Sequence, residues 1–284
     1  MKKLSILLLL SALCSCGRFE GKSGKQGGAR IVCVSKQLTE FLFALNQGDK
    51  IVGVDLSSTY PEAAKTKTTV GYHRHLSAEG IAALEPTLVV HQGDIAPAEV
   101  SAQLATLSIP VKIYPAGNGI DSAKIVLSLL AKELGQERVA DSLNKVLDAD
   151  LEAAATQVAR YPSKPRVLVI HFGQQRNQYF VIGTRGAARR MIELAGGEQA
   201  ADTSGFRNLS PEVIVKLQPD VILATDFGFD RLGGSKEKLL ELPGLALTPA
   251  AKSGRIYRVE EHDLIYFGPR SGKNIQKLAE IIHR

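Results

Sequence analysis

Several residue types are scarce in this chain of 284 residues. It has no tryptophan, two methionines and three cysteines, and aromatic residues make up 6% of it. Three cysteines cannot build a disulfide framework. Hydrophobic residues still account for 44% and charged residues for 23%. This composition is that of a folded protein, so it excludes a disordered or collagen-like chain, and the length allows one large core or two smaller ones.

Long apolar segments are missing too. The run from Leu4 to Leu13 covers about ten residues, whereas a membrane-spanning helix needs about 20. Lys2 and Lys3 precede the run, and a short basic stretch before a short apolar one is typical of a secretory signal. We therefore expect residues 1–15 to be a signal peptide and the protein to be exported, on the periplasmic or cell-surface side.

The end of this signal resembles the bacterial lipobox. Cys16 fits the lipidated cysteine that becomes the mature N-terminus, whereas Cys14 fits poorly because the bulky Leu13 would precede the cut. Ordinary cleavage nearby is the alternative. Residues 16–29 are rich in Gly, Lys and Ser, which predicts a flexible tether between a lipid anchor and the folded part.

The basic charge does not indicate a nucleic-acid partner. The formal charge of +6 falls to +4 when Lys2 and Lys3 leave with the signal. The remaining positive charge is scattered along the chain, and export argues against nucleic acid. Motifs of enzymes are also absent: the sequence has no Gly-x-Ser-x-Gly, P-loop, His-Glu-x-x-His or Cys-x-x-Cys. We expect a binding protein rather than an enzyme.

Short apolar strands alternate with amphipathic helical segments from residue 30 onward. Cys33 lies in the first of these strands and is expected to be a core residue. The alternation predicts an α/β protein with largely parallel sheets. The expected strands are Ile31–Val34, Ile51–Val54, Thr87–Val90, Val111–Tyr114, Arg166–Ile170, Tyr179–Ile182, Val221–Ala224 and Arg255–Val259.

An internal repeat indicates two related lobes. The segments 76–90 and 209–223 match at a constant offset of 133, with identical Leu, Ser, Glu, Ile, Leu and Pro. Each copy is typical of a Ser-capped helix followed by a buried strand. Between them, Gln136 to Tyr161 contains no Gly or Pro and has apolar residues at helical spacing. We expect two Rossmann-like lobes, 30–135 and 163–284, joined by a single long α-helix over 136–162.

This arrangement resembles the substrate-binding proteins of bacterial ABC importers with a rigid interlobe helix. Their ligands include cobalamin, siderophores, haem and metal ions. The haem-binding branch is the finer match, carried by Val70-Gly-Tyr72-His-Arg74-His-Leu-Ser-Ala-Glu79-Gly80, with further segments at 51–61, 183–186, 195–197, 209–212, 242–249 and 267–270. The similarity covers nearly all of residues 30–275.

The resemblance implies that Tyr72 is the axial ligand of ferric haem iron and that Arg74 assists it. A phenolate is a hard anionic ligand suited to Fe(III), and a guanidinium can stabilise it or pair with a haem propionate. His73 and His75 flank Arg74, and each is either exposed to solvent or an auxiliary ligand. Tyr60 is expected to line the cleft without binding iron.

The second lobe contributes further residues to the expected site. His171 follows a strand at the end where α/β folds place ligands, and some relatives hold a second, stacked haem from here; a structural role is the alternative. The resemblance predicts Thr-Arg-Gly after the strand 221–224, but this chain has Thr225-Asp-Phe-Gly-Phe-Asp-Arg231. Arg231 is the substitute in that loop, where Phe227 and Phe229 offer apolar faces to a porphyrin or pack in the core.

Glu79 and Glu212 occupy equivalent places in the two repeats. In the wider family one exposed glutamate per lobe docks on arginines of the permease, while the alternative is favourable placement at a helix N-terminus. The resemblance thus predicts a monomeric, lipid-anchored protein that binds one or two haems and hands them to an ABC permease with its ATPase. A carrier of cobalamin or a ferric siderophore is the alternative.

Overall fold

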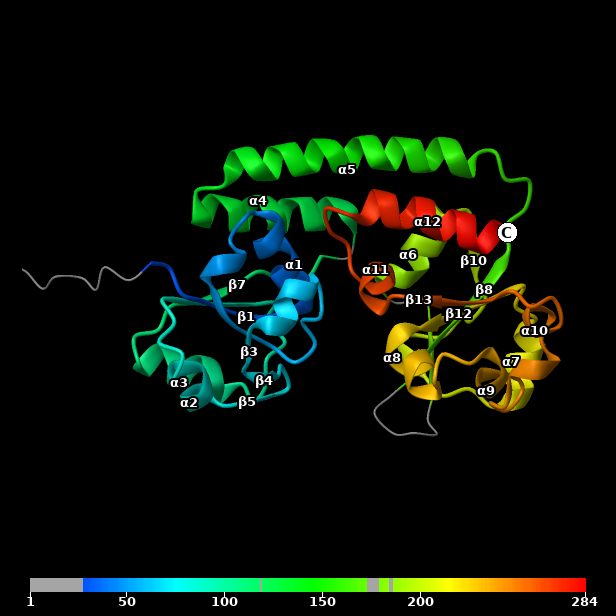
Figure 1. Ribbon diagram of the computed structural model, residues 1–284, viewed down its shortest axis with the longest axis horizontal. Helices are drawn as coiled ribbons and strands as arrows, with labels where there is room; N and C mark the ends of the chain where they lie inside the picture. The colour runs from blue at the N-terminus through cyan, green and yellow to red at the C-terminus, as the bar shows by residue number, and fades with distance from the viewer. Residues whose placement is uncertain (1–27, 118, 173–178, 184–185) are drawn as a thin grey trace, which may run out of the picture.

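A computed structural model of the protein describes residues 28–117, 119–172, 179–183 and 186–284. The expected signal peptide, Cys16, Thr184 and Arg185 lie outside these ranges. Two α/β lobes lie side by side, each built on its own sheet, and a long helix runs along both (Figure 1). The α/β class and the two-lobe organisation predicted from the sequence are confirmed.

The sheet of the first lobe is entirely parallel. Its strand order is β3-β2-β1-β6-β7. The strands are β1 (Ile31–Val34), β2 (Ile51–Val54), β3 (Thr68–Thr69), β6 (Leu88–His91) and β7 (Val111–Ile113). The helices are α1 (Lys36–Ala44), α2 (Ala78–Ala82), α3 (Glu99–Thr106) and α4 (Ile120–Leu134), with 3-10 turns η1 (Gly48–Lys50) and η2 (Glu62–Thr66).

The sheet of the second lobe repeats this order but mixes strand directions. In the order β11-β9-β8-β12-β13, the pairs β8–β12 and β12–β13 are parallel, whereas β9 is antiparallel to both β8 and β11. A short strand β10 also pairs with β8. The strands are β8 (Arg166–Phe172), β9 (Tyr179–Ile182), β10 (Glu198–Gln199), β11 (Phe206–Arg207), β12 (Val221–Thr225) and β13 (Ile256–Val259).

The helices of the second lobe are shorter, apart from the last one, α12. Gly186, Ser210, Ser235 and Thr248 precede four of these helices, and the last three accept a hydrogen bond from the first turn. The elements are α6 (Ala187–Leu194), α7 (Pro211–Leu217), α8 (Asp226–Phe229), η3 (Asp230–Leu232), α9 (Lys236–Leu240), η4 (Leu245–Leu247), α10 (Pro249–Lys252), α11 (Glu261–Ile265) and α12 (Ser271–His283).

The internal repeat predicted from the sequence has a structural counterpart. The hydroxyl of Ser77 accepts a hydrogen bond from the backbone at the start of α2, and Ser210 does the same for α7. Each helix leads into the strand beside the central strand of its sheet, β6 beside β1 and β12 beside β8. The two copies therefore occupy corresponding places in the two lobes.

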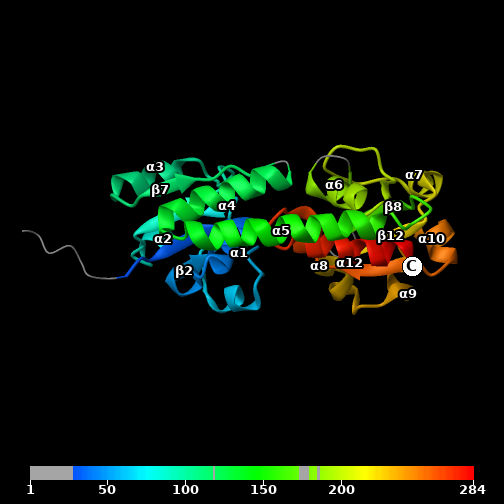
Figure 2. The same cartoon turned by 90° about the horizontal axis from the view of Figure 1, so that it is seen from above.

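The long helix α5 (Glu137–Val158) extends along both lobes (Figure 2). Gly135, in the left-handed region at φ +64°, ends α4 and lets the chain turn into α5. Ala140, Leu147 and Ala154 are buried along its inner face. That face packs on α4 from one lobe and on α12 from the other, so α5 is anchored to each lobe.

The largest core cluster includes residues of both lobes. Apolar residues of α1, α4, α5, β8, α6 and α12 are buried together. Cys33 lies in this cluster with no exposed surface, as its sequence context predicted, and burial raises the pKa of its thiol to about 12. Two smaller clusters fill the outer faces of the sheets. Within the described ranges, no helix has the length and apolar character needed to cross a bilayer.

Candidate functional site

Tyr72 lies on a small hairpin of the first lobe. Strands β4 (Gly71–Tyr72) and β5 (His75–Leu76) are antiparallel, and Tyr72 is directly opposite His75. Gly71 has φ +108°, and a Cβ atom there would lie 3.2 Å from the His75 carbonyl oxygen, so the hairpin requires glycine. Tyr72 is half-buried, while Arg74 and His75 are exposed.

The His73 side chain packs beneath this hairpin instead of pointing into solvent. Its Nδ1 lies 3.7 Å from Asp55 Oδ2 and its Nε2 lies 3.7 Å from Asp94 Oδ2. The Tyr72 ring lies against it, with 4.3 Å between ring centroids and 59° between ring planes. Both imidazole nitrogens therefore face carboxylates, and the ring supports the tyrosine.

Asp55 is a fixed anion in this arrangement. It is buried, and it accepts hydrogen bonds from the Ser57 amide and from the hydroxyls of Ser57 and Ser58. Burial opposes ionisation of Asp55, but the contacts with His73, Ser57 and Ser58 outweigh it and lower the pKa of the carboxyl below its ordinary value of 3.8. A permanent negative charge thus lies behind the hairpin.

A polar patch where the lobes meet adjoins the hairpin. Lys36, at the first turn of α1, pairs with Glu261 of the second lobe at 2.6 Å, and both side chains are mostly buried. The Lys36 ammonium lies 5.8 Å from the ring centroid of Tyr266. Burial, followed by the charges of Glu261, Asp55 and Asp94 and the proximity of Tyr72, raises the pKa of the Tyr266 phenol. Tyr266 therefore stays neutral.

His171 reaches the same patch from the second lobe. The sequence suggested that it follows a strand, but β8 continues to Phe172 because β9 pairs with it, and His171 lies opposite Phe180. Its Nδ1 lies 2.9 Å from Thr225 Oγ1. Burial lowers the pKa of His171, with opposing effects from Glu261 and Asp226 and a smaller lowering by Lys36. The neutral imidazole that this favours is the form that binds metals.

Lys36, Glu261 and Tyr266 form one interlobe patch, whose charges act on His171 and whose Tyr266 phenol is influenced by Tyr72. The sequence reasoning did not single out these three residues. Lys36 could have been found, because it follows the carboxyl end of β1, where parallel sheets place ligands. Tyr266 and Glu261 carried no such signal, since their proximity to the first lobe depends on how the lobes pack.

The altered loop of the second lobe forms a short helix and a 3-10 turn. Phe229 is 5% exposed and packs in the core of that lobe, which favours the core alternative over a porphyrin contact. Arg231 lies exposed in η3. Its neighbour Asp230 pairs with Arg258 at 2.7 Å, so this loop is bound to β13.

Tyr60 belongs to a neighbouring interlobe cluster, which meets the patch through His262, whose ring centroid lies 5.5 Å from that of Tyr266. The Arg270 guanidinium lies 3.7 Å from its ring centroid, and the His262 ring stacks on it at 5.3 Å. Both partners also contact Glu40 of α1. The structure therefore places Tyr60 against the joint between the lobes and does not bring it to Tyr72.

Glu79 and Glu212 are both exposed at the first turns of α2 and α7. Ser77 donates a hydrogen bond of 2.7 Å to Glu79. The contacts with Ser77 and Ser210 lower the pKa values of Glu79 and Glu212 respectively. The two carboxylates are therefore charged and held in equivalent positions on the two lobes.

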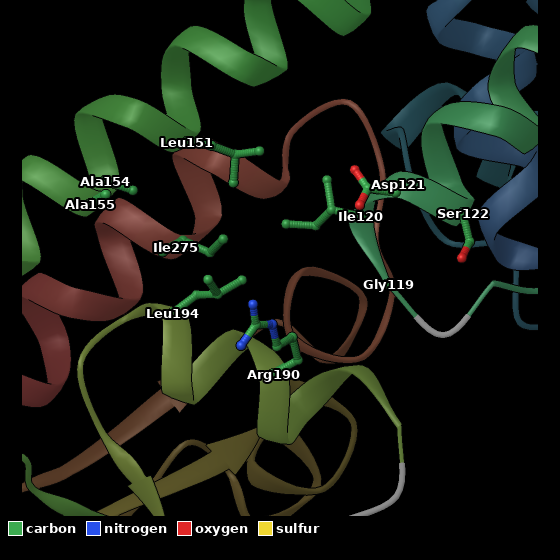
Figure 3. Close-up of a pocket in the computed structure, with 10 residues that line it drawn as sticks. All are labelled: Gly119, Ile120, Asp121, Ser122, Leu151, Ala154, Ala155, Arg190, Leu194 and Ile275. Carbon is green, nitrogen blue, oxygen red and sulfur yellow. The ribbon is translucent and has the colours of Figure 1, made fainter.

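A cavity of about 530 Å³ lies beneath α5, away from the residues described so far (Figure 3). It is bounded by the start of α4, the middle of α5, α6 and α12, and Arg190 and Asp121 line it with mostly apolar neighbours. None of the site residues predicted from the sequence lies in its lining.

Comparison with known proteins identifies the family of this chain. The family described as periplasmic binding protein matches residues 31–262. The apo structure of the periplasmic haem-binding protein RhuT from Roseiflexus sp. RS-1 is 36% identical, with a TM-score of 0.84, covering 90% of this chain and 98% of that one. The periplasmic haem-binding protein BhuT, in complex with two haems, is 31% identical with a TM-score of 0.82, covering 89% and 97%.

Two curated relatives match at lower identity. An uncharacterised ABC transporter substrate-binding lipoprotein, YvrC of Bacillus subtilis, is 28% identical over 263 residues, which are 91% of this chain and 81% of that protein. A vitamin B12-binding protein of Yersinia pestis is 28% identical over 202 residues, 70% of each. The match to the family model over most of the chain and the shared two-lobe fold lead to one conclusion: the chain belongs to the periplasmic binding protein family.

Proposed function

We propose that this protein binds ferric haem between its two lobes, with Tyr72 as an iron ligand, and delivers it to an ABC permease. The observation that carries the proposal is that residues of both lobes are coupled electrostatically to one interlobe patch. Tyr72 of the first lobe contributes to the raised pKa of Tyr266, and Glu261 and Lys36 influence the pKa of His171 in the second lobe, while the Lys36 ammonium lies 5.8 Å from the Tyr266 ring centroid. Two flat ligands stacked between the lobes can each take one donor, one from either lobe. Tyr72 supplies a hard oxygen ligand for Fe(III), and His171 a neutral nitrogen ligand.

The surrounding charges suit the rest of the haem. Arg74 is exposed beside Tyr72, and Arg231 is exposed in the second lobe. Guanidinium groups form strong, charge-assisted hydrogen bonds with carboxylates such as propionates. The rings of Tyr72 and Tyr266 offer aromatic faces for a porphyrin. We assign Tyr72 and Arg74 to the first haem and His171 to a second one.

Delivery to a permease follows from the family and from the two glutamates. Substrate-binding proteins of this type serve ABC importers, and the relative from Bacillus subtilis is described in those words. Glu79 and Glu212 present matched negative charges on the two lobes, and we assign them to docking on basic residues of the permease. The expected signal and Cys16 complete the proposal of an exported, lipid-anchored monomer without enzymatic activity.

A carrier of cobalamin is the second candidate, favoured by the relative from Yersinia pestis. Binding of hemin and of cyanocobalamin should be compared by equilibrium dialysis and absorbance on the same preparation. We expect hemin to bind tightly with a shifted Soret band and cyanocobalamin to bind weakly or not at all. Tight binding of cyanocobalamin, or of a ferric siderophore, with no retention of hemin would overturn the proposal.

A further inference from the structure

The contacts of His73 point to a role that neither its sequence context nor the family assigns. Its imidazole lies between two carboxylates, with Nδ1 toward Asp55 and Nε2 toward Asp94, each at 3.7 Å. The side chain of His73 is 17% exposed although its two neighbours in the turn and in β5, Arg74 and His75, are exposed. The hairpin therefore turns this one side chain inward.

The two carboxylates hold the imidazole unequally. The Asp55 side chain has no exposed surface, and three hydrogen bonds from Ser57 and Ser58 fix it. The Asp94 side chain is 55% exposed, so water competes for this carboxylate and screens its charge. Asp55 is accordingly the stronger anchor, and the Nδ1 side of the imidazole is the side that matters more.

The backbone of the hairpin is already bound to the lobe. The Ala96 amide donates to the His73 carbonyl at 2.8 Å, the Leu76 amide donates to the Ala96 carbonyl at 3.0 Å, and the Leu56 amide donates to the Gly71 carbonyl at 2.8 Å. These bonds fix the path of the chain but do not involve the Tyr72 side chain. The His73 ring, with its centroid 4.3 Å from that of the Tyr72 ring, is the nearer of two imidazoles that limit rotation of this side chain, the His75 ring centroid lying at 6.3 Å.

We propose that His73, anchored by Asp55 and secondarily by Asp94, is a positioning residue that holds the Tyr72 phenol in place, and that it does not bind iron. The inference rests on the proposed function, in which Tyr72 is the iron ligand. Groups behind a metal ligand orient it, and their loss weakens metal binding by about 10–100-fold in other proteins. His73 acts in this way through ring packing, because both its nitrogens face carboxylates at 3.7 Å while its ring lies against that of Tyr72 at 4.3 Å.

The test compares hemin complexes of the full chain and three variants at His73. We expect His73→Ala to retain hemin but to release it to apomyoglobin about tenfold faster, with a broadened tyrosinate charge-transfer band and several ferric species by electron paramagnetic resonance. His73→Asn and His73→Gln keep an amide nitrogen near the Nδ1 and Nε2 positions respectively but have no ring. Because ring packing holds the phenol, we expect both to behave like His73→Ala.

A matched control is available at the other end of the molecule. His283 stacks on Tyr161 with ring centroids 3.9 Å apart and an interplanar angle of 1°. His283→Ala removes a histidine–tyrosine contact of the same kind, and we expect it to change the melting temperature without changing the haem spectrum or release rate. Circular dichroism of all variants checks that they are folded.

Three results would overturn the inference. One is a His73→Ala complex with the spectrum and release rate of the wild type, which would make the ring contact irrelevant. Another is the loss, in His73→Ala, of a nitrogen ligand signal that the wild type shows, which would make His73 an iron ligand. The third is a wild-type complex without any tyrosinate signal, which would remove the proposed role of Tyr72 and this inference with it. This failure of the proposed function is distinguishable from failure of the inference, because it is seen in the wild type before any substitution at His73.

Discussion

Glu40 of α1 and Arg270 at the start of α12 form an ion pair across the two lobes, with 2.8 Å between Glu40 Oε1 and Arg270 Nε. Glu40 is 8% exposed in this contact, and its other carboxylate oxygen faces His262 Nε2. Lys36 and Glu261 form a second pair across the same interface. The lobes are thus connected by side chains as well as by α5, which favours a nearly fixed distance between them.

Removing Arg270 should destabilise the protein markedly. The substitution Arg270→Ala leaves the buried Glu40 carboxylate without its guanidinium partner, and breaking a buried pair in this way costs about 3 kcal/mol or more. The control is Arg189→Ala, because Arg189 pairs with Glu193 at 2.7 Å on an exposed helix face, where such a pair contributes at most about 1 kcal/mol. Urea unfolding measures the free energy of unfolding of both variants. Equal decreases in Arg270→Ala and Arg189→Ala would contradict a buried ion pair between the lobes.

The same pair should make stability depend on pH. Burial opposes ionisation of Glu40, but contacts with His262 and Arg270 outweigh it and lower the pKa of the Glu40 carboxyl in the folded protein below its ordinary value of 4.5. A carboxyl whose pKa is lower in the folded than in the unfolded protein stabilises the fold at pH values above its unfolded-state pKa. This stabilisation is lost as the pH falls through its folded-state pKa. We therefore expect Glu40→Gln to be less stable than the wild type at pH 7, with the difference shrinking toward pH 3.

Urea midpoints at pH 7, 5 and 3 measure this difference. A constant gap between Glu40→Gln and the wild type at all three values would mean that the ionised carboxylate contributes nothing. The exposed Glu152 of α5 offers a control, because Glu152→Gln should change neither the stability nor its pH dependence.

The sequence predicted the strands closely and the contacts between lobes hardly at all. Continuous apolar runs such as Ile31–Val34 define buried strands locally, and a stretch without Gly or Pro defines α5. Tyr72 was predicted as a site residue from its motif. Lys36, Glu261 and Tyr266 were not, because 225 residues separate Lys36 from Glu261 and no local pattern records that pairing. Strand β8 is longer than expected for a similar reason, since its extension depends on pairing with β9.

Charge reversal at the two matched glutamates should separate delivery from binding. We expect Glu79→Lys combined with Glu212→Lys to abolish most haem-dependent growth in cells, because like charges would then face the basic residues proposed on the permease. Hemin affinity of the purified variant should equal that of the wild type. Glu152→Lys lies on α5, on the side of the lobes opposite to α2 and α7 (Figure 1), and should leave growth intact. Equal loss of hemin binding and growth would contradict a docking role.

Loss of His171 should change the number of haems bound. In the proposal this residue holds a second haem, as its neutral imidazole beside Thr225 allows. We expect titration of the wild type to break at two equivalents of hemin and that of His171→Ala to break at one. An unchanged break point in His171→Ala would leave His171 with the structural role of bonding to Thr225.

Titration of hemin into the wild type and Tyr72→Phe, followed in the Soret and charge-transfer regions, tests the central claim most directly. Phenylalanine keeps the ring against His73 and removes only the oxygen that is proposed to bind iron. We predict a saturating Soret shift with a tyrosinate charge-transfer band in the wild type, and loss of that band with much weaker binding in Tyr72→Phe. No perturbation at one equivalent of hemin, or identical spectra of the two proteins, would contradict the account.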